Sequence, residues 1–338
     1  MSNVVKIAGT TLQAGERKRI ELPVTTMANG LDLSISVHIL NGAKPGPKML
    51  LTALSHGDAT TGFECIRQVL ESVDLSALSG TIIAVPFQNP IGFEWDSRNT
   101  PIDDNNMNRC YPGRATGWFT EQLCGAISPL CKEADFLIDW HGGGYGMAIN
   151  YVLLSRESGA LGEEIHAMGR AYGLKLMYDG TPAGPAAAYA GTLTDYMIAQ
   201  GKPAIVAEVG TGMNLDKDII RTSVRGVFNV MKYKGMLEGK PEVEHDQYLV
   251  KDRPLLRPQR GGMFYPLAGP EKLNETVPKG TPIAEIRNPR TLEVIETIYA
   301  PCTETVFLML RGFMTKVHPG DYAYILGDLS TAEHYVND

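Results

Sequence analysis

The sequence predicts a three-layer α/β domain with a mixed, mostly parallel sheet, followed by a small all-β domain. The chain has 338 residues, which is long for one compact unit, so two domains are expected. In the first part, short apolar runs alternate with helical segments, as in strands that are covered by helices. After the polar stretch EGKPEVEHDQY, short strand-like segments follow with Gly and Pro between them. We therefore expect domains at 1–244 and 245–338.

The strands and helices of the first domain are predicted from its apolar patterns. The stretch LDLSISVHIL (31–40) alternates apolar residues with smaller or polar ones, which indicates a strand. Other runs are continuously apolar, as expected of strands buried on both faces. These runs are MLLTALS, GTIIAVPFQNP, ADFLIDWH, YVLLS and PAIVAEVG. Apolar residues with helical spacing predict helices within 60–73 and 215–237.

The second domain is predicted to contain strands and almost no helix. Its apolar segments are short and are separated by Gly and Pro, which is typical of a small all-β domain. The segments are RGGMFYPLAG, TVPKGTPIAEI, LEVIETIYAP, ETVFLML and TKVHPGDYAYIL.

Composition and charge exclude several classes of protein. The chain is 43% hydrophobic and 20% charged, which is ordinary for a soluble globular protein. Its net charge of −7 argues against a nucleic-acid partner, because such surfaces are basic. We expect a cytoplasmic protein without membrane contact, since neither an apolar run of about 20 residues nor a secretory signal is visible. The five cysteines are scattered without a CxxC pair, which excludes a disulfide framework.

Polar residues stand at the ends of three predicted strands. His56 follows MLLTALS, His141 ends ADFLIDWH, and Glu208 lies near the end of PAIVAEVG. Ligands bind at the carboxyl ends of parallel strands, so these side chains are candidates for one shared site. Imidazole and carboxylate groups bind Zn²⁺, and a further carboxylate can activate a metal-bound water. The alternative for each residue alone is a hydrogen-bonded cap at a strand end.

A long polar segment, 88–113, separates the first two of these strand ends. It is rich in Asn and acidic residues, and we predict a loop without regular secondary structure, a kind of loop that tends to be functional. Arg98 and Arg109 are candidates to bind a carboxylate or a developing oxyanion, and Asn108 adds an amide donor. The alternative is a solvated loop whose arginines balance its own acids.

Four motifs together resemble a known family. They are HGD with the following GFE, the NP.GF…R…D…NR.YPG pattern, DWHGG and AEVG, in this order and spacing. The combination resembles the succinylglutamate desuccinylase/aspartoacylase family, a branch of the zinc-carboxypeptidase-like hydrolases, over most of residues 45–325. The resemblance implies a zinc-carboxypeptidase-like catalytic domain. The tail, with its MFYP, VPKG, IYAP and VHPGD segments, resembles the barrel-like C-terminal domain of that family.

The resemblance implies roles for the residues at the strand ends. His56 and His141 would bind one Zn²⁺ per subunit, and Asp139 would orient His141. Glu208 would be the general base that activates water and later protonates the leaving amine.

The resemblance also implies roles within the 88–113 segment. Arg98 would stabilise the tetrahedral oxyanion, while Asn108 and Arg109 would hold a carboxylate of the substrate. The implied activity is that of a zinc-dependent hydrolase that cleaves linear amides, such as a small N-acyl amino acid, rather than peptide bonds.

This sequence departs from the family pattern at Ala59, where the family has a glutamate that is the remaining protein ligand. Asp58 is one candidate to replace it, and Asp103 or Asp104 from the polar segment is another. Otherwise the site binds metal weakly or not at all, or Ala59 is an engineered substitution. Without a third ligand the metal loses a charge-assisted bond that contributes several kcal/mol to its binding, so Zn²⁺ is expected only with a substitute.

Two rival functions remain open at this point. One is a catalytically impaired family member that binds a small molecule, which Ala59 favours. The other is a carboxypeptidase-like peptidase, although a β domain folded over the site would restrict it to small substrates. In each case the expected partner is a small molecule, with a carboxylate in the favoured case. Family habit suggests a homodimer or tetramer.

Other features carry weaker predictions. HGGGYG lacks a following helix and a Lys-Ser/Thr end, so we do not expect a phosphate loop. The small residues of 182–197 are expected to form a pocket wall before a helix. Tyr265 and Tyr299 are expected to pack inside the β domain. No G-x-S-x-G elbow supports a serine nucleophile.

Overall fold

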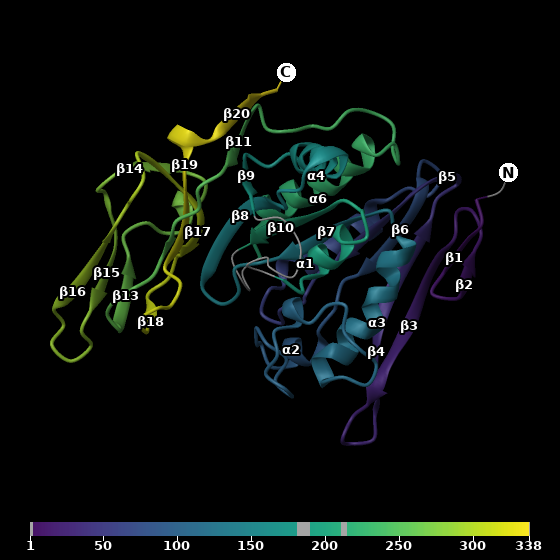
Figure 1. Cartoon of the computed structure of the whole chain (residues 1–338), viewed down its shortest axis with the longest axis horizontal. Helices are drawn as coiled ribbons and strands as arrows, with labels where there is room; N and C mark the ends of the chain where they lie inside the picture. Colours follow the sequence, from purple (N-terminus) through teal and green to yellow (C-terminus); the bar gives the residue numbers. More distant parts are fainter. Residues whose placement is uncertain (1–2, 181–189, 211–214, 338) are drawn as a thin grey trace.

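The computed structural model describes residues 3–180, 190–210 and 215–337. Within these residues a mixed sheet of 14 strands crosses the molecule (Figure 1). Its central strands are parallel to one another, in the order β10, β7, β5, β6. Their bounds are Ala204–Gly210 for β10, Phe136–His141 for β7, Lys44–Thr52 for β5 and Ser79–Val85 for β6. This order brings the carboxyl ends of the predicted buried strands to one edge.

Antiparallel strands flank the parallel centre on both sides. On one side β4 (Asp32–Asn41) pairs with β6 and β3 (Arg17–Thr26) pairs with β4. On the other side β8 (Met147–Leu154) runs antiparallel to β10, and β9 (Leu176–Asp179) runs parallel to β8. The short strands β1 (Val5–Ile7) and β2 (Thr10–Leu12) form a separate pair. The mixed sheet confirms the predicted fold class.

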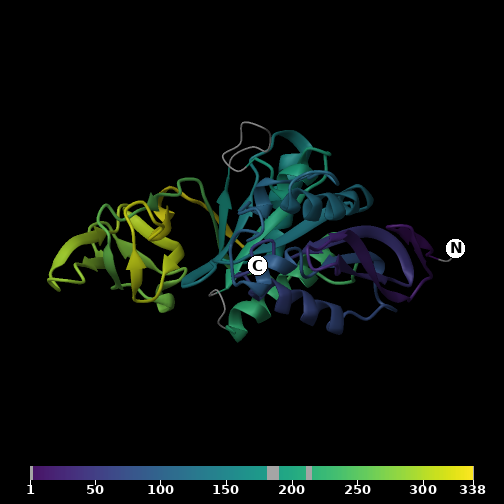
Figure 2. The same cartoon turned by 90° about the horizontal axis from the view of Figure 1, so that it is seen from below.

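Helices cover both faces of this sheet and make the three layers (Figure 2). One face is contacted by α1 (Thr61–Ser72), α4 (Gly159–Tyr172) and α6 (Lys217–Tyr233). The other is contacted by α3 (Phe119–Glu133) and α5 (Leu193–Ile198). Alternation along β7 explains the division, because Trp140 packs against Gly62 and Tyr172 while Asp139 and His141 point the other way. The catalytic candidates therefore share a face with α3 and α5.

The strands after residue 245 extend the same sheet. β11 (Asp246–Val250) pairs with β9 and with β20 (Glu333–Val336), and β17 (Glu304–Arg311) pairs with β8. β19 (Tyr324–Asp328) pairs with β17 and with β12 (Leu255–Leu256). β14 (Thr276–Pro278) also pairs with β17. Strands on both sides of the predicted boundary thus share one sheet.

The C-terminal part also has a sheet and a core of its own. Its four strands are ordered β16-β15-β13-β18, with bounds Val294–Tyr299, Pro282–Arg287, Gly262–Pro266 and Thr315–Val317. Apolar side chains between this sheet and the large one form a separate core that includes Phe264, Phe307 and Tyr324. The described helices here are single 3-10 turns, η2 (Pro270–Lys272) and η3 (Leu329–Thr331), which confirms the β-rich prediction.

Two expectations for the segments around the strand ends were wrong in detail. The strand that precedes His56 ends at Thr52, so the histidine lies in the connection to α1. The 88–113 segment contains the helix α2 (Pro90–Glu94) and the 3-10 turn η1 (Met107–Arg109). Pro90 suits the first turn of α2, and the side chain of Asn89 accepts a hydrogen bond from Gly92 N, which caps that helix.

The two tyrosines that were expected to pack inside the β domain lie on its surface. Tyr265 is 37% exposed and lies under the guanidinium of Arg287, and Tyr299 is 53% exposed. They lie at the fourth and sixth positions of their strands, where alternation directs them away from the core. None of the helices described is both long and apolar enough to span a bilayer.

Candidate active site

Two imidazoles and a carboxylate meet at the carboxyl ends of β5, β7 and β10. The ring centroids of His56 and His141 are 5.2 Å apart, although 85 positions separate them in the chain. Glu208 is the register partner of His141 in the parallel pair of β10 and β7. Partners on neighbouring strands project to the same face, so Glu208 lies beside His141. The structure thus brings together the three residues that the sequence selected at strand ends.

His56 is held by the backbone of the 88–113 segment. Its Nδ1 donates a hydrogen bond to the carbonyl oxygen of Arg98 at 3.0 Å, because a carbonyl can only accept. This tautomer leaves the lone pair of the neutral ring on Nε2. Burial lowers the pKa of His56 well below its ordinary value, and the charges of Arg98 and His141 lower it further. His56 is therefore a neutral imidazole at physiological pH.

Two polar side chains lie at the Nε2 atom of His141. This atom lies 2.9 Å from Asp139 Oδ2 and 3.1 Å from Asn108 Nδ2. Burial opposes the charged form of this ring, but the charge and hydrogen bond of Asp139 outweigh burial and raise the pKa of His141. A proton on Nε2, donated to Asp139, fits both the shorter distance and this direction of the shift. Asn108 Nδ2 is itself a donor, so with this protonation it packs against Nε2 without a hydrogen bond. The expected contact between Asp139 and His141 is present.

A buried chain of hydrogen bonds fixes Asp139 in turn. Asp139 Oδ1 accepts from Thr52 Oγ1 at 2.6 Å and from Gln88 Nε2 at 3.3 Å. Tyr111 Oη donates to Gln88 Oε1 at 2.6 Å. Sequence reasoning missed Gln88, Thr52 and Tyr111. The available signal was that polar side chains stand inside or next to apolar strands, where burial requires partners.

Asn108 is engaged within the site. Its Oδ1 accepts from Leu193 N at 3.1 Å, which orients the amide so that Nδ2 points to His141. The side chain is buried, with 8% exposure. Arg109 is exposed; it donates to the carbonyl of Asn108, and its charge acts on His56. Of the predicted carboxylate-binding pair, Arg109 is the residue that is open to solvent.

Arg98 and Glu208 complete the electrostatics of the site. Burial raises the pKa of Glu208 above its ordinary value of 4.5, and the positive groups of His141, Arg98 and Arg253 partly offset that rise. The charge of Arg98 lowers the pKa of His56, His141 and Glu208. A carboxylate with a raised pKa beside a guanidinium suits proton transfer next to a developing oxyanion.

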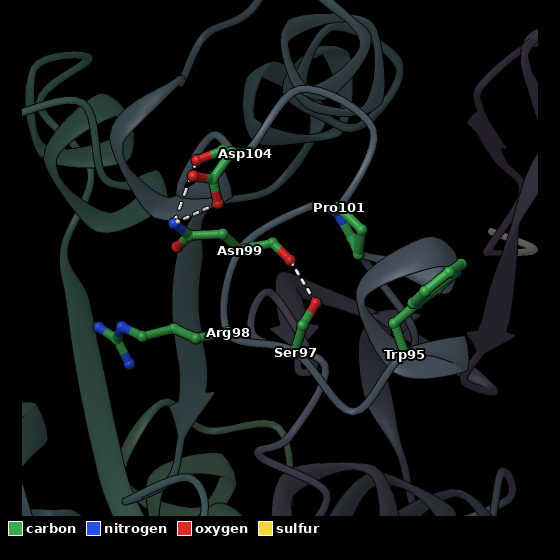
Figure 3. Close-up of a pocket in the computed structure, with 6 residues that line it drawn as sticks. All are labelled: Trp95, Ser97, Arg98, Asn99, Pro101 and Asp104. Carbon is green, nitrogen blue, oxygen red and sulfur yellow. Dashed lines mark hydrogen bonds between the residues drawn. The ribbon is translucent and has the colours of Figure 1, made fainter.

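The segment that carries Arg98 also lines a surface hollow of about 410 Å³. Trp95, Ser97, Asn99, Pro101 and Asp104 line it together with Arg98. Figure 3 shows the Arg98 side chain extending away from Trp95 and Pro101, while Asn99 points to Asp104. The Arg98 guanidinium therefore points away from the Trp95 and Pro101 wall of the hollow.

Close packing between two glycines docks this segment on the loop that holds His56. Gly57 N donates to Ser97 O at 3.0 Å, and a Cβ on Gly57 would lie 2.0 Å from the carbonyl carbon of Gly92. No side chain fits at that distance, so the backbones meet directly. This contact places the carbonyl of Arg98 at His56.

Ala59, where the sequence departs from the motif, is buried close to Gly142. Its side chain is 3% exposed, and its Cβ is 3.4 Å from the position that a Cβ on Gly142, next to His141, would occupy. Asp58 is directed to the glycine-rich turn instead, because its Oδ2 accepts from Tyr145 N at 3.2 Å. Asp58 Oδ1 is buried and has no hydrogen-bond partner.

The donors present do not complete a zinc site. In the part of the chain that the structure describes, no three His, Cys, Asp or Glu side chains lie together in an arrangement for a metal ion. Asp103 accepts from Thr120 at the start of α3, and Asp104 accepts from Asn99. Catalytic zinc sites use three protein ligands, whereas His56 and His141 supply two. Zn²⁺ with Asp58 as the substitute stays a prediction.

The predicted pocket wall at 182–197 lies only partly within the described residues, since 181–189 are outside them. In its described part, the Thr192 side chain accepts from Asp195 N and begins α5. The helix predicted at the end of this stretch is therefore present.

Fold and site together define an α/β protein whose polar residues gather at the carboxyl ends of parallel strands. A model of the succinylglutamate desuccinylase/aspartoacylase catalytic domain matches residues 45–234. The chain belongs to this family, which confirms the resemblance drawn from its motifs.

Similar proteins agree with this assignment. The N-alpha-acetyl-L-2,4-diaminobutyric acid deacetylase of Halomonas elongata is 25% identical over 297 residues, which are 84% of this chain and 83% of that protein. Two solved structures match with TM-scores of 0.81 and 22% identity. They are a succinylglutamate desuccinylase from Silicibacter sp. TM1040, covering 93% of this chain and 94% of its own, and the product-bound ectoine utilization protein EutE from Ruegeria pomeroyi, covering 92% and 95%. The two structures confirm the fold.

Proposed function

We propose that this protein hydrolyses the amide bond of a small N-acyl amino acid or a related carboxylate. The observation that carries the proposal is the juxtaposition of Glu208, His141 and His56 at the carboxyl ends of the parallel strands, where the charge of Arg98 also acts. The name of the Halomonas relative, a deacetylase of an N-acetylated diamino acid, supports the same class of substrate.

The residues suggest a simple sequence of steps. Glu208 takes a proton from a water molecule, and the water oxygen attacks the amide carbonyl. Arg98 stabilises the oxyanion of the tetrahedral intermediate. Glu208 then returns the proton to the amine nitrogen as the carbon–nitrogen bond breaks, which yields a carboxylic acid and an amine. Transfer of the acid proton to the amine leaves a carboxylate and an ammonium group. Arg109, with Asn108 behind it, would hold the substrate carboxylate.

Zn²⁺ enters this proposal only as a condition. His56 and His141 are the residues that would hold it, but the two imidazoles leave the donor set incomplete at Ala59. No step above is therefore routed through a metal. Metal analysis of the protein, purified without chelators, tests the condition: about one zinc per chain supports it, and zinc-free active protein contradicts it.

The test of the activity is release of a primary amine. Purified protein is incubated with N-acetyl-L-2,4-diaminobutyrate, N-acetyl-L-aspartate and N-succinyl-L-glutamate, and free amine is measured by fluorescamine. Release by the native protein that is lost in Glu208→Gln supports hydrolysis, since glutamine has the same shape and cannot accept the proton. If none of the three compounds releases amine, the result counts against the proposal.

A binding function is the second candidate, and Ala59 is the observation that favours it. Calorimetry with the same compounds separates the two. Saturable binding of an unhydrolysed N-acyl amino acid, without amine release, would identify a small-molecule binding protein.

A further inference from the structure

A row of side chains continues from the candidate site across the sheet. Glu208 on β10 is the register partner of His141 on one side and of Tyr151, on β8, on the other. Leu153, two positions after Tyr151, is the partner of Tyr178 on β9. Since register partners and alternate residues share a face, all of these side chains lie on the same face of the sheet. Glu208, Tyr151 and Tyr178 thus form a row that leads from His141 toward β9.

Arg253 covers the end of this row. It lies in the connection between β11 and β12, in the part of the chain after residue 245. Its Nη1 donates to Tyr151 Oη at 3.2 Å, and its Cζ lies 4.5 Å from the centre of the Tyr178 ring. Stacking on one tyrosine and bonding to another hold the guanidinium in a defined orientation at the site. Its charge also acts on Glu208.

A guanidinium held in this way is suited to bind an anion. Arginine has five N–H donors in a planar fork that matches the two oxygens of a carboxylate. Tyr151 is one of the partners of this guanidinium, and the side chain as a whole is half-buried. Arg98 and Arg109 belong to the 88–113 segment, so Arg253 places a further positive charge beyond Glu208, on the side of β8 and β9.

We propose that Arg253 is a substrate-binding residue of this site, and that it selects substrates with an anionic group at the Tyr151 end of the row. The inference rests on the proposed function, because it assumes that the reacting amide lies at Glu208. It gives the C-terminal part of the chain a direct role in specificity. The sequence offered no motif for this residue, which is 112 positions after His141 in the chain.

The test compares two ligands that differ by one charge. Succinate carries two carboxylates, and succinamate has the same shape with one of them replaced by an amide. Binding of each is measured by calorimetry for the native protein, Arg253→Met and Arg253→Lys. Arg257→Met is the matched control, because Arg257 stacks on Tyr322 at 4.4 Å and bonds to the carbonyl of Gly320, within the C-terminal part.

The expected result is a change in preference. A charge-assisted hydrogen bond of the usual strength corresponds to about a 10- to 100-fold difference in Kd. Arg253→Met should weaken succinate binding by this factor and leave succinamate nearly unchanged, whereas Arg257→Met should leave both unchanged. Arg253→Lys should lose part of the preference, because lysine keeps the charge without the planar fork.

Three outcomes would overturn the inference. In the first, Arg253→Met weakens the binding of succinate and succinamate equally. In the second, it weakens the binding of neither ligand. In the third, the native protein binds succinate no more tightly than succinamate. If Arg253→Met does not fold, the succinate preference of Arg253→Lys decides, and an unchanged preference contradicts the role. Binding is independent of turnover, so a native protein with the preference but no amine release refutes the proposed function alone.

Discussion

Replacing Ala59 by glutamate tests the geometry of the whole site. Ala59 is buried next to Gly142, which follows His141, so a longer side chain at this position would extend among groups that surround the two imidazoles. The substitution adds the single donor that the cluster lacks. We expect Ala59→Glu to bind Zn²⁺ more tightly than the native protein.

The size of the effect follows from the number of ligands. Structural zinc sites with four protein ligands bind with roughly 10–16 kcal/mol, so one added ligand contributes about 3 kcal/mol, or a 100-fold lower Kd. Without metal the new carboxylate is buried at a position with 3% exposure. An uncompensated buried charge costs several kcal/mol, so the metal-free variant should melt at a lower temperature than the native protein.

The assay is a zinc titration of chelator-treated protein against a chromophoric competitor, with melting curves recorded in parallel. Ala59→Gln is the control, because it has the same length and no charge. Zinc should raise the melting temperature of Ala59→Glu far more than that of Ala59→Gln. Equal zinc affinity in the two variants would refute the proposed convergence of His56 and His141 on one ion.

Further predictions concern the base and its supports. Glu208→Gln should lower kcat by about 10²- to 10⁴-fold in the amine-release assay, with an unchanged melting temperature. Because Glu208 acts deprotonated and burial raises its pKa, activity should fall as the pH falls through a value above 4.5, and a pH–rate profile without that limb would contradict its role. Tyr111→Phe should cost about 1–3 kcal/mol in urea unfolding, since Gln88 Oε1 loses its buried donor. Gly57→Ala should destabilise by at least about 2 kcal/mol, because its Cβ would overlap Gly92; an unchanged unfolding midpoint in either variant would contradict the packing described.

Much of the architecture was predictable because local sequence carries it. Continuous apolar runs such as ADFLIDWH correspond to strands with helices on both sides, and helical spacing in 60–73 and 215–237 corresponds to α1 and α6. The regular structure in 88–113 was missed, because α2 depends on Pro90 and an Asn89 cap within a polar stretch. Short capped helices lack the apolar periodicity on which such predictions depend.

The sequence by itself determined which residues are candidates, because polar side chains at the ends of buried strands in an α/β fold collect at one edge. Only the tertiary structure decided their partners: Asp139 and Asn108 at His141, the Arg98 carbonyl at His56, and the turn of Asp58 toward Tyr145. It also brought Arg253 to Tyr151 from 102 positions away. The reason is physical: strand register and side-chain alternation set these contacts, and both depend on pairing between segments that are distant in the chain.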